Sequence, residues 1–338
     1  MRPLGKTVAV ALAVVGVVSL VLGGSALAGE LRTGAGAGGG AGPGVPSAAP
    51  EVEADQPDPG WRWESYRTVK VQVPDNWEDS SYSHLWTCGN RKGRPSGISK
   101  GPLVGRPYRG PVFAMDCGPV SPLAERVPHL WFGESDVKPG ITRFDHGWAS
   151  EVRVVDGVAL TVFGNDAALR RRILDSAEPI GGTTDPNGCA IARPAVLADG
   201  QRPTGPGLSA IGEVGSIRVC AYSYGTPSEP STFQAGHVIS GDAARQLGDA
   251  LRAAPPGVGP DMGASNCEQS SQRDDLLVTV RGENGEQEVL VRYATCRSNG
   301  TDDGTTLRRL TTDTLVPLSK VLYAAFPVLP ILRDLAGR

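Results

Sequence analysis

Six cysteines constrain the fold of this 338-residue chain more than any other feature of its sequence. They form an even set, and no two are spaced as Cys-x-x-Cys, so the spacing of a zinc ribbon is absent. An even, well-spaced set in an oxidising compartment usually forms disulfides. We therefore predict three bridges among Cys88, Cys117, Cys189, Cys220, Cys267 and Cys296.

Pairing of nearest neighbours would close three loops, Cys88–Cys117, Cys189–Cys220 and Cys267–Cys296. Each loop has about thirty residues, and closing it contributes roughly 3 to 4 kcal/mol by the chain-entropy model. One alternative stays open, in which Cys189 pairs with Cys267 and Cys220 with Cys296.

The N-terminus, residues 1–28, has the pattern of an export segment. Arg2 and Lys6 precede an uncharged apolar run, and Ala26-Leu27-Ala28 has the small-x-small form that signal peptidase recognises. The segment is either a cleaved signal peptide or an uncleaved membrane anchor, since about 20 apolar residues span a bilayer. Both readings place the rest of the chain outside the cytosol, because the basic residues stay inside.

Residues 29–60 have the composition of a disordered linker. Gly34 to Gly44 is almost wholly Gly and Ala, and a Pro-rich acidic stretch follows. Such a segment cannot bury enough apolar surface to order itself, and we expect a flexible reach of roughly 30 Å.

The remaining sequence predicts an α+β fold with two small disulfide-bonded domains, residues 61–182 and 183–318. Each would consist of short antiparallel strands and hairpins with one main helix. Residues 319–338 form an apolar tail interrupted by Pro327 and Pro330, which we expect to dock on the second domain.

In the first domain, Tyr66–Val73 alternates as a strand does. Asp156-Gly157 lies between two alternating apolar runs, the strongest short-range signal for a hairpin. Asn165-Asp166 then caps a helix over Ala167–Ser176, and Arg170-Arg171-Arg172 on this helix is predicted to face solvent.

In the second domain, the patterns predict a strand over Ser216–Tyr222 and a helix from Ser240 or Asp242 to about Ala253. Two further strands, Leu276–Arg281 and Glu288–Ala294, are joined by a polar loop. Thr305–Leu318 is a short final element that ends as a helix.

All six tryptophans lie in the first domain, where most are expected to fill its core and margins. Trp61 and Trp63, at the junction with the linker, are the two that we expect to be exposed. They are therefore the candidate ligand-contact residues.

No motif indicates catalysis, a cofactor or a metal ion. His84, His129, His146 and His237 are scattered, and the Gly-x-Ser-x-Gly, Ser-x-x-Lys and His-Glu-x-x-His signatures are absent. The oxygen-rich segments Gly181–Gly188 and Asn299–Gly304 do not fit a calcium loop, so both are predicted to be turns. A net charge of -3 gives no electrostatic footprint for nucleic acid.

Residues 219–296 contain VCAYSYG, SGDAARQLGDALRAAP, NC and ATC in this order. With the export segment and the linker, this order resembles uncharacterised exported proteins of actinobacteria. The resemblance implies a cell type and no activity.

Together these patterns predict an exported cell-envelope or secreted protein that binds an envelope protein or a cell-wall ligand. It would contact a membrane only through an uncleaved N-terminal segment. The alternatives are an extracytoplasmic hydrolase, with His129 or His146 near acids such as Asp116 and Asp145, and a purely structural envelope component.

Overall fold

The structure is a computed structural model that describes residues 56–80, 101–107, 122–134, 137–192, 194, 201–223, 232–261, 274–293, 295, 297–321 and 335. The predicted export segment, most of the linker and four cysteines (Cys88, Cys117, Cys267 and Cys296) lie outside these residues. All described residues belong to one compact unit, residues 52–338. Within the described ranges, no helix has the length and apolar character needed to cross a membrane.

A small antiparallel sheet begins the described chain. Strands β1 (Trp61–Tyr66) and β2 (Val69–Pro74) form a hairpin, and β9 (Glu178–Pro179) pairs with β2. The strand predicted over Tyr66–Val73 is therefore confirmed from Val69 onward, and its predicted beginning is wrong. The chain turns at Arg67, whose φ is 54°, and this turn contains no Gly, Pro or Asn that would have indicated it.

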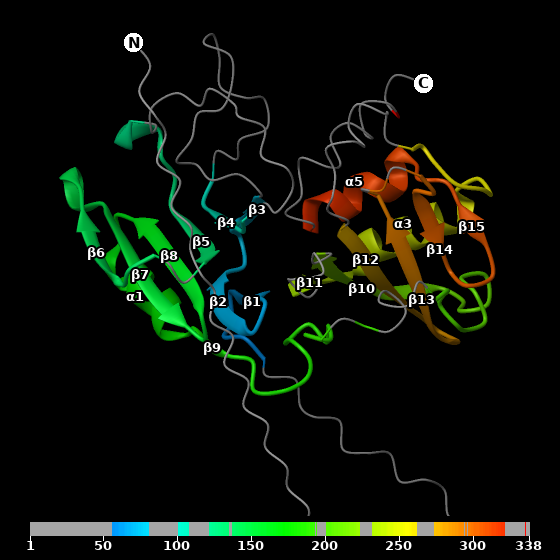
Figure 1. Ribbon diagram of the computed structural model, residues 1–338, viewed down its shortest axis with the longest axis horizontal. Helices are drawn as coiled ribbons and strands as arrows, with labels where there is room; N and C mark the ends of the chain where they lie inside the picture. The colour runs from blue at the N-terminus through cyan, green and yellow to red at the C-terminus, as the bar shows by residue number, and fades with distance from the viewer. Residues whose placement is uncertain are drawn as a thin grey trace, which may run out of the picture. The chain divides into compact units, whose positions relative to one another are not determined.

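A six-stranded sheet, here called the mixed sheet, has the order β3-β4-β5-β8-β7-β6 (Figure 1). Its strands are β3 (Glu78–Ser80), β4 (Leu103–Gly105), β5 (His129–Glu134), β6 (Gly140–Arg143), β7 (Ala149–Val155) and β8 (Val158–Gly164). The β7–β8 hairpin is confirmed, and its turn residues Asp156 and Gly157 both have positive φ, as a type I′ turn requires. However, β3–β4 and β4–β5 are parallel pairs, so the expectation of antiparallel strands throughout is wrong.

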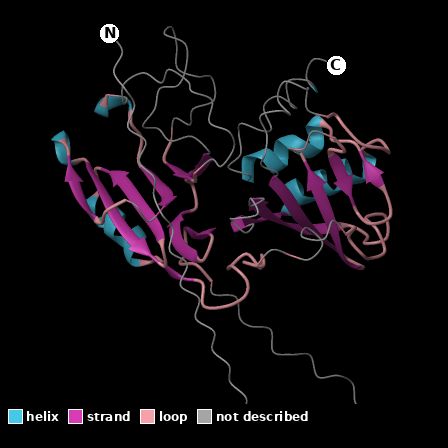
Figure 2. Cartoon of the chain, viewed as in Figure 1, coloured by secondary structure: helices cyan, strands magenta, loops and turns pink. Residues whose placement is uncertain are grey.

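Helix α1 (Ala167–Asp175) lies on one face of the mixed sheet (Figure 2). Its predicted cap is confirmed, because a carboxylate oxygen of Asp166 accepts hydrogen bonds from two backbone N–H groups of the first turn, at 2.9 and 3.0 Å. Ile173 and Leu174 are buried as expected. Arg170 is buried too, and it donates to the Gly164 carbonyl at 2.7 Å, so its predicted exposure is wrong.

The second six-stranded sheet is antiparallel, with the order β11-β10-β12-β13-β14-β15. Its strands are β10 (Val214–Ser223), β11 (Thr232–Ser240), β12 (Asp274–Gly282), β13 (Gly285–Arg292), β14 (Gly300–Asp302) and β15 (Leu307–Arg308). They confirm and extend the three strands predicted in this region.

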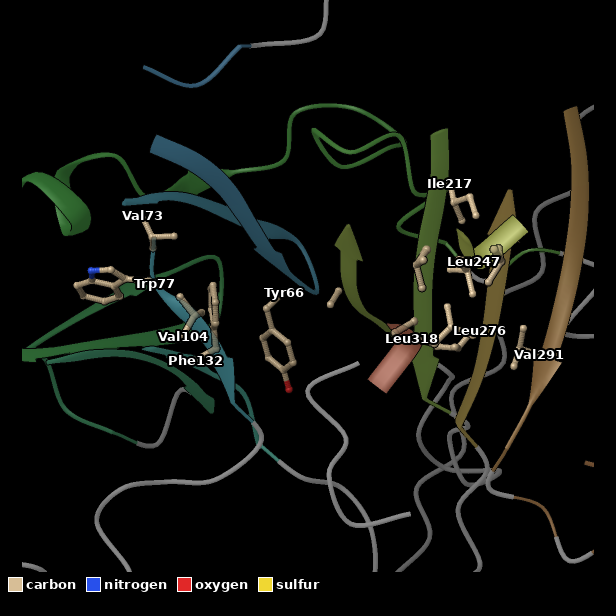
Figure 3. Packing of buried hydrophobic residues seen from close by; sticks show 14 of the residues in the cluster. Tyr66, Val73, Trp77, Val104, Phe132, Ile217, Leu247, Leu276, Val291 and Leu318 are labelled. Atoms are coloured by element: carbon tan, nitrogen blue, oxygen red, sulfur yellow. The ribbon is translucent and has the colours of Figure 1, made fainter. Parts of the chain in front are cut away.

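Two α-helices accompany this sheet, where one main helix was expected. Helix α3 (Gly241–Ala253) packs on β10 and β11, and α5 (Thr312–Val321) contacts α3. Their buried side chains meet those of the strands, as Figure 3 shows for Leu247, Ile217 and Leu276. Short 3-10 turns at Leu123–Glu125 and Asp145–Gly147 complete the helical elements of the described chain. Of the apolar tail, Leu335 packs against the main core.

Cys189 and Cys220 form a disulfide, with their Cα atoms 5.6 Å apart. This pairing is the nearest-neighbour prediction for these two residues, and it excludes the alternative bridge from Cys189 to Cys267. The bridge lies in a small buried cluster with Tyr222, Phe233, Leu277 and Leu290. A disulfide is consistent with an extracytoplasmic location.

Hydrogen bonds connect the two predicted domains. The hydroxyl of Ser65 in β1 donates to Asp185 at 2.5 Å, and the N–H of Arg67 donates to the carbonyl of Phe233 in β11 at 3.2 Å. The α+β class is therefore observed, with sheets dominating, while the division into two domains stays a prediction.

Candidate functional site

Exposed apolar side chains gather around β6, the last strand of the mixed sheet. Val137, Ile141 and Phe144 are 42%, 47% and 36% exposed, and all three lie within eight residues. The other large apolar side chains that are exposed in the described ranges, Val238, Val258 and Leu307, belong to the antiparallel sheet and its loops. We call Val137, Ile141, Phe144 and Trp148 the β6 patch. Ile141 pairs with Glu151 and so lies on the α1 face of the sheet, whereas Phe144 and Trp148 lie against Phe163 on the other face, so these side chains border the sheet edge from both sides. Exposed apolar side chains gathered at one place are typical of an interaction site.

Aromatic packing supports the β6 patch. The Phe163 ring on β8 lies 5.8 Å from the Phe144 ring, 4.9 Å from the Trp148 ring and 5.1 Å from the His129 ring. Phe163 is buried, so it provides a fixed base for the two more accessible rings. Phe144 and Trp148 are thereby held in place before any ligand arrives.

These rings lie on the face of the mixed sheet opposite α1. Ser150 pairs with Phe163 across β7 and β8, and the next residue, Glu151, projects to the other face because side chains alternate along a strand. There the Glu151 carboxylate lies 3.8 Å from Arg170 of α1. The aromatic face of the sheet is therefore the one that α1 does not cover.

The surroundings of the β6 patch are basic. The guanidinium of Arg126 lies over the Phe144 ring, 5.4 Å from its centroid. Lys138 and Arg143 flank Ile141 and are exposed, and neither forms an ion pair with another described residue. Asp145 is the one acid in the described stretch 137–148. The surface thus combines apolar area with a net positive charge.

The predicted ligand contacts, Trp61 and Trp63, have a different environment. Trp63 is only 9% exposed, so its expected exposure is wrong, and the Lys70 ammonium lies 4.5 Å from its ring centroid. Trp61 is half-buried, and the Arg172 guanidinium lies 3.8 Å from its ring centroid. A cation therefore already covers one face of each indole. Their role in ligand contact stays a prediction.

The histidines considered as candidates for a hydrolase site make other contacts in the structure. His129 is buried, its ring stacks on Phe163, and its Nδ1 lies 2.9 Å from the Val127 carbonyl oxygen. His146 is exposed in the turn before β7 and has a φ of 58°. Asp116 and His84 lie outside the described residues.

Ser65, Asp185 and His237 are brought near one another but not as a catalytic triad. Gly236 faces Asp185, because a Cβ built on this glycine would collide with the Asp185 carboxylate. His237, the next residue along β11, must project to the opposite face of the strand. The acid and the histidine are thus separated by the strand itself, which removes the acid–histidine contact that a triad needs.

The Asp185 carboxylate forms hydrogen bonds that connect two parts of the structure. It is buried and accepts hydrogen bonds from the Ser65 hydroxyl at 2.5 Å and from the Cys189 N–H at 2.7 Å. Burial raises the pKa of Asp185, and these hydrogen bonds oppose that effect. The carboxylate therefore ties β1 to the disulfide loop.

The oxygen-rich segment Asn299–Gly304 was predicted to be a turn, and this is wrong for Gly300–Asp302, which forms β14; the turn to β15 starts at Asp303. The Asp303 carboxylate accepts from the backbone N–H groups of Leu208, Thr305 and Thr306, at 3.1, 2.9 and 2.6 Å. Burial raises the pKa of Asp303, but the hydrogen bonds together outweigh burial and the pKa is lowered. Within the described residues, no group of three His, Cys, Asp or Glu side chains could hold a metal ion.

His237 should make stability depend on pH. Burial lowers its pKa below 6.5; Glu64 opposes this effect, and Arg62 and Arg106 add to it. The unfolded chain then binds the proton more readily, so stability falls as the pH decreases from about 6.5 through the folded-state pKa. Replacing His237 with Gln should make the melting temperature less dependent on pH over this range. The exposed His146→Gln variant is the control, and its melting temperature should vary with pH as that of the wild type does. If the melting temperature of His237→Gln also varies with pH as in the wild type, His237 is not the source of the pH dependence.

The β6 patch was not predicted from the sequence. Its signal is the short run Ile141-Thr142-Arg143-Phe144, which does not alternate between apolar and polar residues and which comes shortly after Lys138 and Pro139. Lys and Pro beside a short strand are typical of an exposed sheet edge. The run was not singled out because four residues are too few to distinguish a strand from a turn.

The resemblance to exported actinobacterial proteins stays a prediction. Comparisons of the chain with protein-family models, with curated proteins and with solved structures find no match.

Proposed function

We propose that this chain is an exported binding module that uses the β6 patch to contact a protein of the cell envelope. The observation that carries the proposal is the concentration of exposed Val137, Ile141 and Phe144 on one sheet edge. Burying this surface against a partner would be favourable, at about 25 cal/mol per Å² of apolar area. The export segment predicted from the sequence and the Cys189–Cys220 bridge support an extracytoplasmic setting.

The arrangement suits binding better than catalysis. Exposed rings on a rigid base give a ligand apolar contact area at low entropic cost. A hydrolase would need a nucleophile and a base in contact, and the described histidines lie against aromatic rings, on an exposed turn, or across a strand from Asp185.

A cell-wall saccharide is the second candidate ligand, and Trp131 favours it. Trp131 on β5 is half-buried and lies on the same side as the position a Cβ would take at Gly133, 3.9 Å from its Cδ1. A Cβ at that position would be in ordinary van der Waals contact with Ala159 and Trp131, so Gly133 leaves room for one small group beside the indole. The half-buried Trp131 ring is the part of this region that a sugar ring would contact.

The test compares two matched double variants of the exported chain in cross-linking to envelope proteins. Ile141→Ala/Phe144→Ala removes exposed side chains of the β6 patch, and Val238→Ala/Leu307→Ala removes exposed side chains elsewhere. We expect the first variant to lose at least about ten-fold in cross-linked partner, since two anchors at an interface centre contribute more than 1.4 kcal/mol. The second variant should behave as the wild type.

Three outcomes would contradict the proposal. Equal cross-linking by both double variants would move the binding surface away from β6. Binding to purified cell wall that depends on Trp131 and not on Ile141 would support the saccharide instead. Turnover in an esterase, peptidase and glycosidase panel that disappears in His129→Ala or His146→Ala would support the hydrolase.

A further inference from the structure

We propose that β6 binds an extended acidic segment of the partner protein, which adds to the mixed sheet as a further strand. This inference rests on the proposed function and names the kind of partner that the β6 patch fits. It follows from the backbone direction at β6, from the state of the other sheet edges, and from the charges beside the strand.

The backbone of β6 offers hydrogen-bonding groups on its outer side. Phe144 donates its N–H to the carbonyl of Trp148 at 2.8 Å, which makes them a hydrogen-bonded pair of the β6–β7 ladder. Because such pairs alternate in an antiparallel ladder, Thr142 and Gly140 also bond inward to β7. The N–H and C=O groups of Ile141 and Arg143 therefore point away from β7.

No described residue bonds to this outer side. The strand order places β6 at the end of the mixed sheet, as Figure 1 shows, and its ladder hydrogen bonds go to β7 alone among the described residues. Ile141 and Arg143 are two residues apart along the edge, which is the spacing at which an added strand forms its hydrogen bonds. Both faces of β6 are exposed, so side chains of an added strand would have room on either side.

Two other sheet edges are covered where β6 is not. At the β11 edge of the antiparallel sheet, Arg67 from the β1–β2 turn donates to the Phe233 carbonyl at 3.2 Å. At the β15 edge, Gly257 donates to the Leu307 carbonyl at 2.9 Å. Chain segments of the protein itself thus bond to these two edges, which distinguishes β6 from β11 and β15.

The positively charged side chains beside β6 favour an acidic partner. Lys138 and Arg143 stand on either side of Ile141, and Arg126 lies over Phe144. The described acids nearby are Asp145 and Glu151, and Glu151, which pairs with Ile141, already lies 3.8 Å from Arg170. Opposite charges on facing strands attract, and like charges repel. A second copy would bring two sets of these cations to one short ladder, whereas a strand with alternating acidic residues would neutralise them.

Lys138 and Pro139 also restrict how far pairing can extend. Pro139 has no N–H to donate, and Lys and Pro are residues that protect sheet edges from indiscriminate pairing. An acidic strand overcomes the charge part of this protection, which a neutral or basic strand does not. The edge is therefore selective for the acidic partner.

The test uses blocked octapeptides as probes of the full chain. In the first, valine alternates with glutamate; in the second, lysine replaces glutamate; in the third, which stays acidic, proline replaces two central valines. We expect the first peptide to bind at least about ten-fold more tightly than either of the others. At saturation it should slow hydrogen exchange of the Ile141 and Arg143 amides more than that of Thr142, which is already bonded to β7.

Variants then separate charge from backbone pairing. Lys138→Glu/Arg143→Glu should reverse the preference between the acidic and the basic peptide. Ile141→Pro removes one outward N–H and no bond to β7, and should reduce binding of the acidic peptide at least about ten-fold. Leu307→Ala, on the covered β15 edge, is the control and should bind as the wild type does.

Equal binding of the acidic and basic peptides, no binding of any of them, or no protection of the Ile141 and Arg143 amides would overturn the inference. Self-association that Ile141→Pro abolishes would overturn it in favour of a second copy. The proposed function fails separately: it is rejected when Ile141→Ala/Phe144→Ala cross-links to envelope proteins as the wild type does. If that variant loses its partner while the acidic peptide does not bind, only the added strand is rejected.

Discussion

Replacing Arg106 with Ala should lower the free energy of unfolding by about 3 to 5 kcal/mol, the loss typical of a buried ion pair that has lost one partner. The Arg106 guanidinium lies 2.7 Å from the Glu64 carboxylate, and both side chains are 3% exposed. It also donates to the Ser65 carbonyl at 2.8 Å and lies over the Phe132 ring. Without it, the Glu64 charge would stay buried with Arg62 as its remaining described partner.

Urea denaturation of the variant measures this loss. Arg172→Ala is the matched control, because its ion pair with Asp58 is exposed and its cation–π contact with Trp61 is at the surface. The Arg172→Ala replacement should lower the free energy of unfolding by about 1 kcal/mol. Equal losses for the two variants would show that the buried pair does not stabilise the hairpin β1–β2 as described.

The second large effect concerns the disulfide. Replacing Cys189 and Cys220 together with Ala should lower the free energy of unfolding by about 3 to 4 kcal/mol, because the bridge closes a 31-residue separation in the unfolded chain. The bridge also lies in a buried cluster with Tyr222 and Phe233, so its loss leaves space in that cluster.

Comparing the double variant with the wild type, both without reductant, gives the size of this effect. Reductant should lower the stability of the wild type toward that of the variant. A double variant that unfolds at the wild-type urea concentration would mean that the bridge constrains a segment already ordered in the unfolded ensemble.

Local signals predicted part of the fold well. The β7–β8 hairpin followed from Asp156-Gly157, and the start of α1 followed from Asp166, because the backbone geometry of both features depends on one or two neighbouring residues. The Cys189–Cys220 bridge agrees with the nearest-neighbour pairing, but the sequence left Cys189–Cys267 open as an alternative.

Features that depend on distant residues were not predicted. The parallel contacts of β4 with β3 and β5 join strands far apart in the sequence, and no local pattern indicates them. Arg170 lies in a run of three arginines, and only the position of the Gly164 carbonyl explains why this one is buried.

The candidate site shows the same limit. Trp63 was expected at the surface because it follows a linker, but the hairpin and Lys70 enclose it. The β6 patch could not be predicted, because the exposure of Phe144 results from its place at the end of the mixed sheet. A sequence indicates which residues are apolar, and the tertiary arrangement decides which of them stay in contact with water.

The dissociation constant of the cross-linked partner, once purified, tests the central claim most directly. For Ile141→Ala/Phe144→Ala we predict an increase of about thirty-fold over the wild type, corresponding to about 2 kcal/mol from anchors at the centre of an interface. For Val238→Ala/Leu307→Ala we predict no change, since these exposed side chains lie outside the β6 patch. An unchanged dissociation constant for the first variant, with its fold intact by melting temperature, would contradict the assignment of binding to β6.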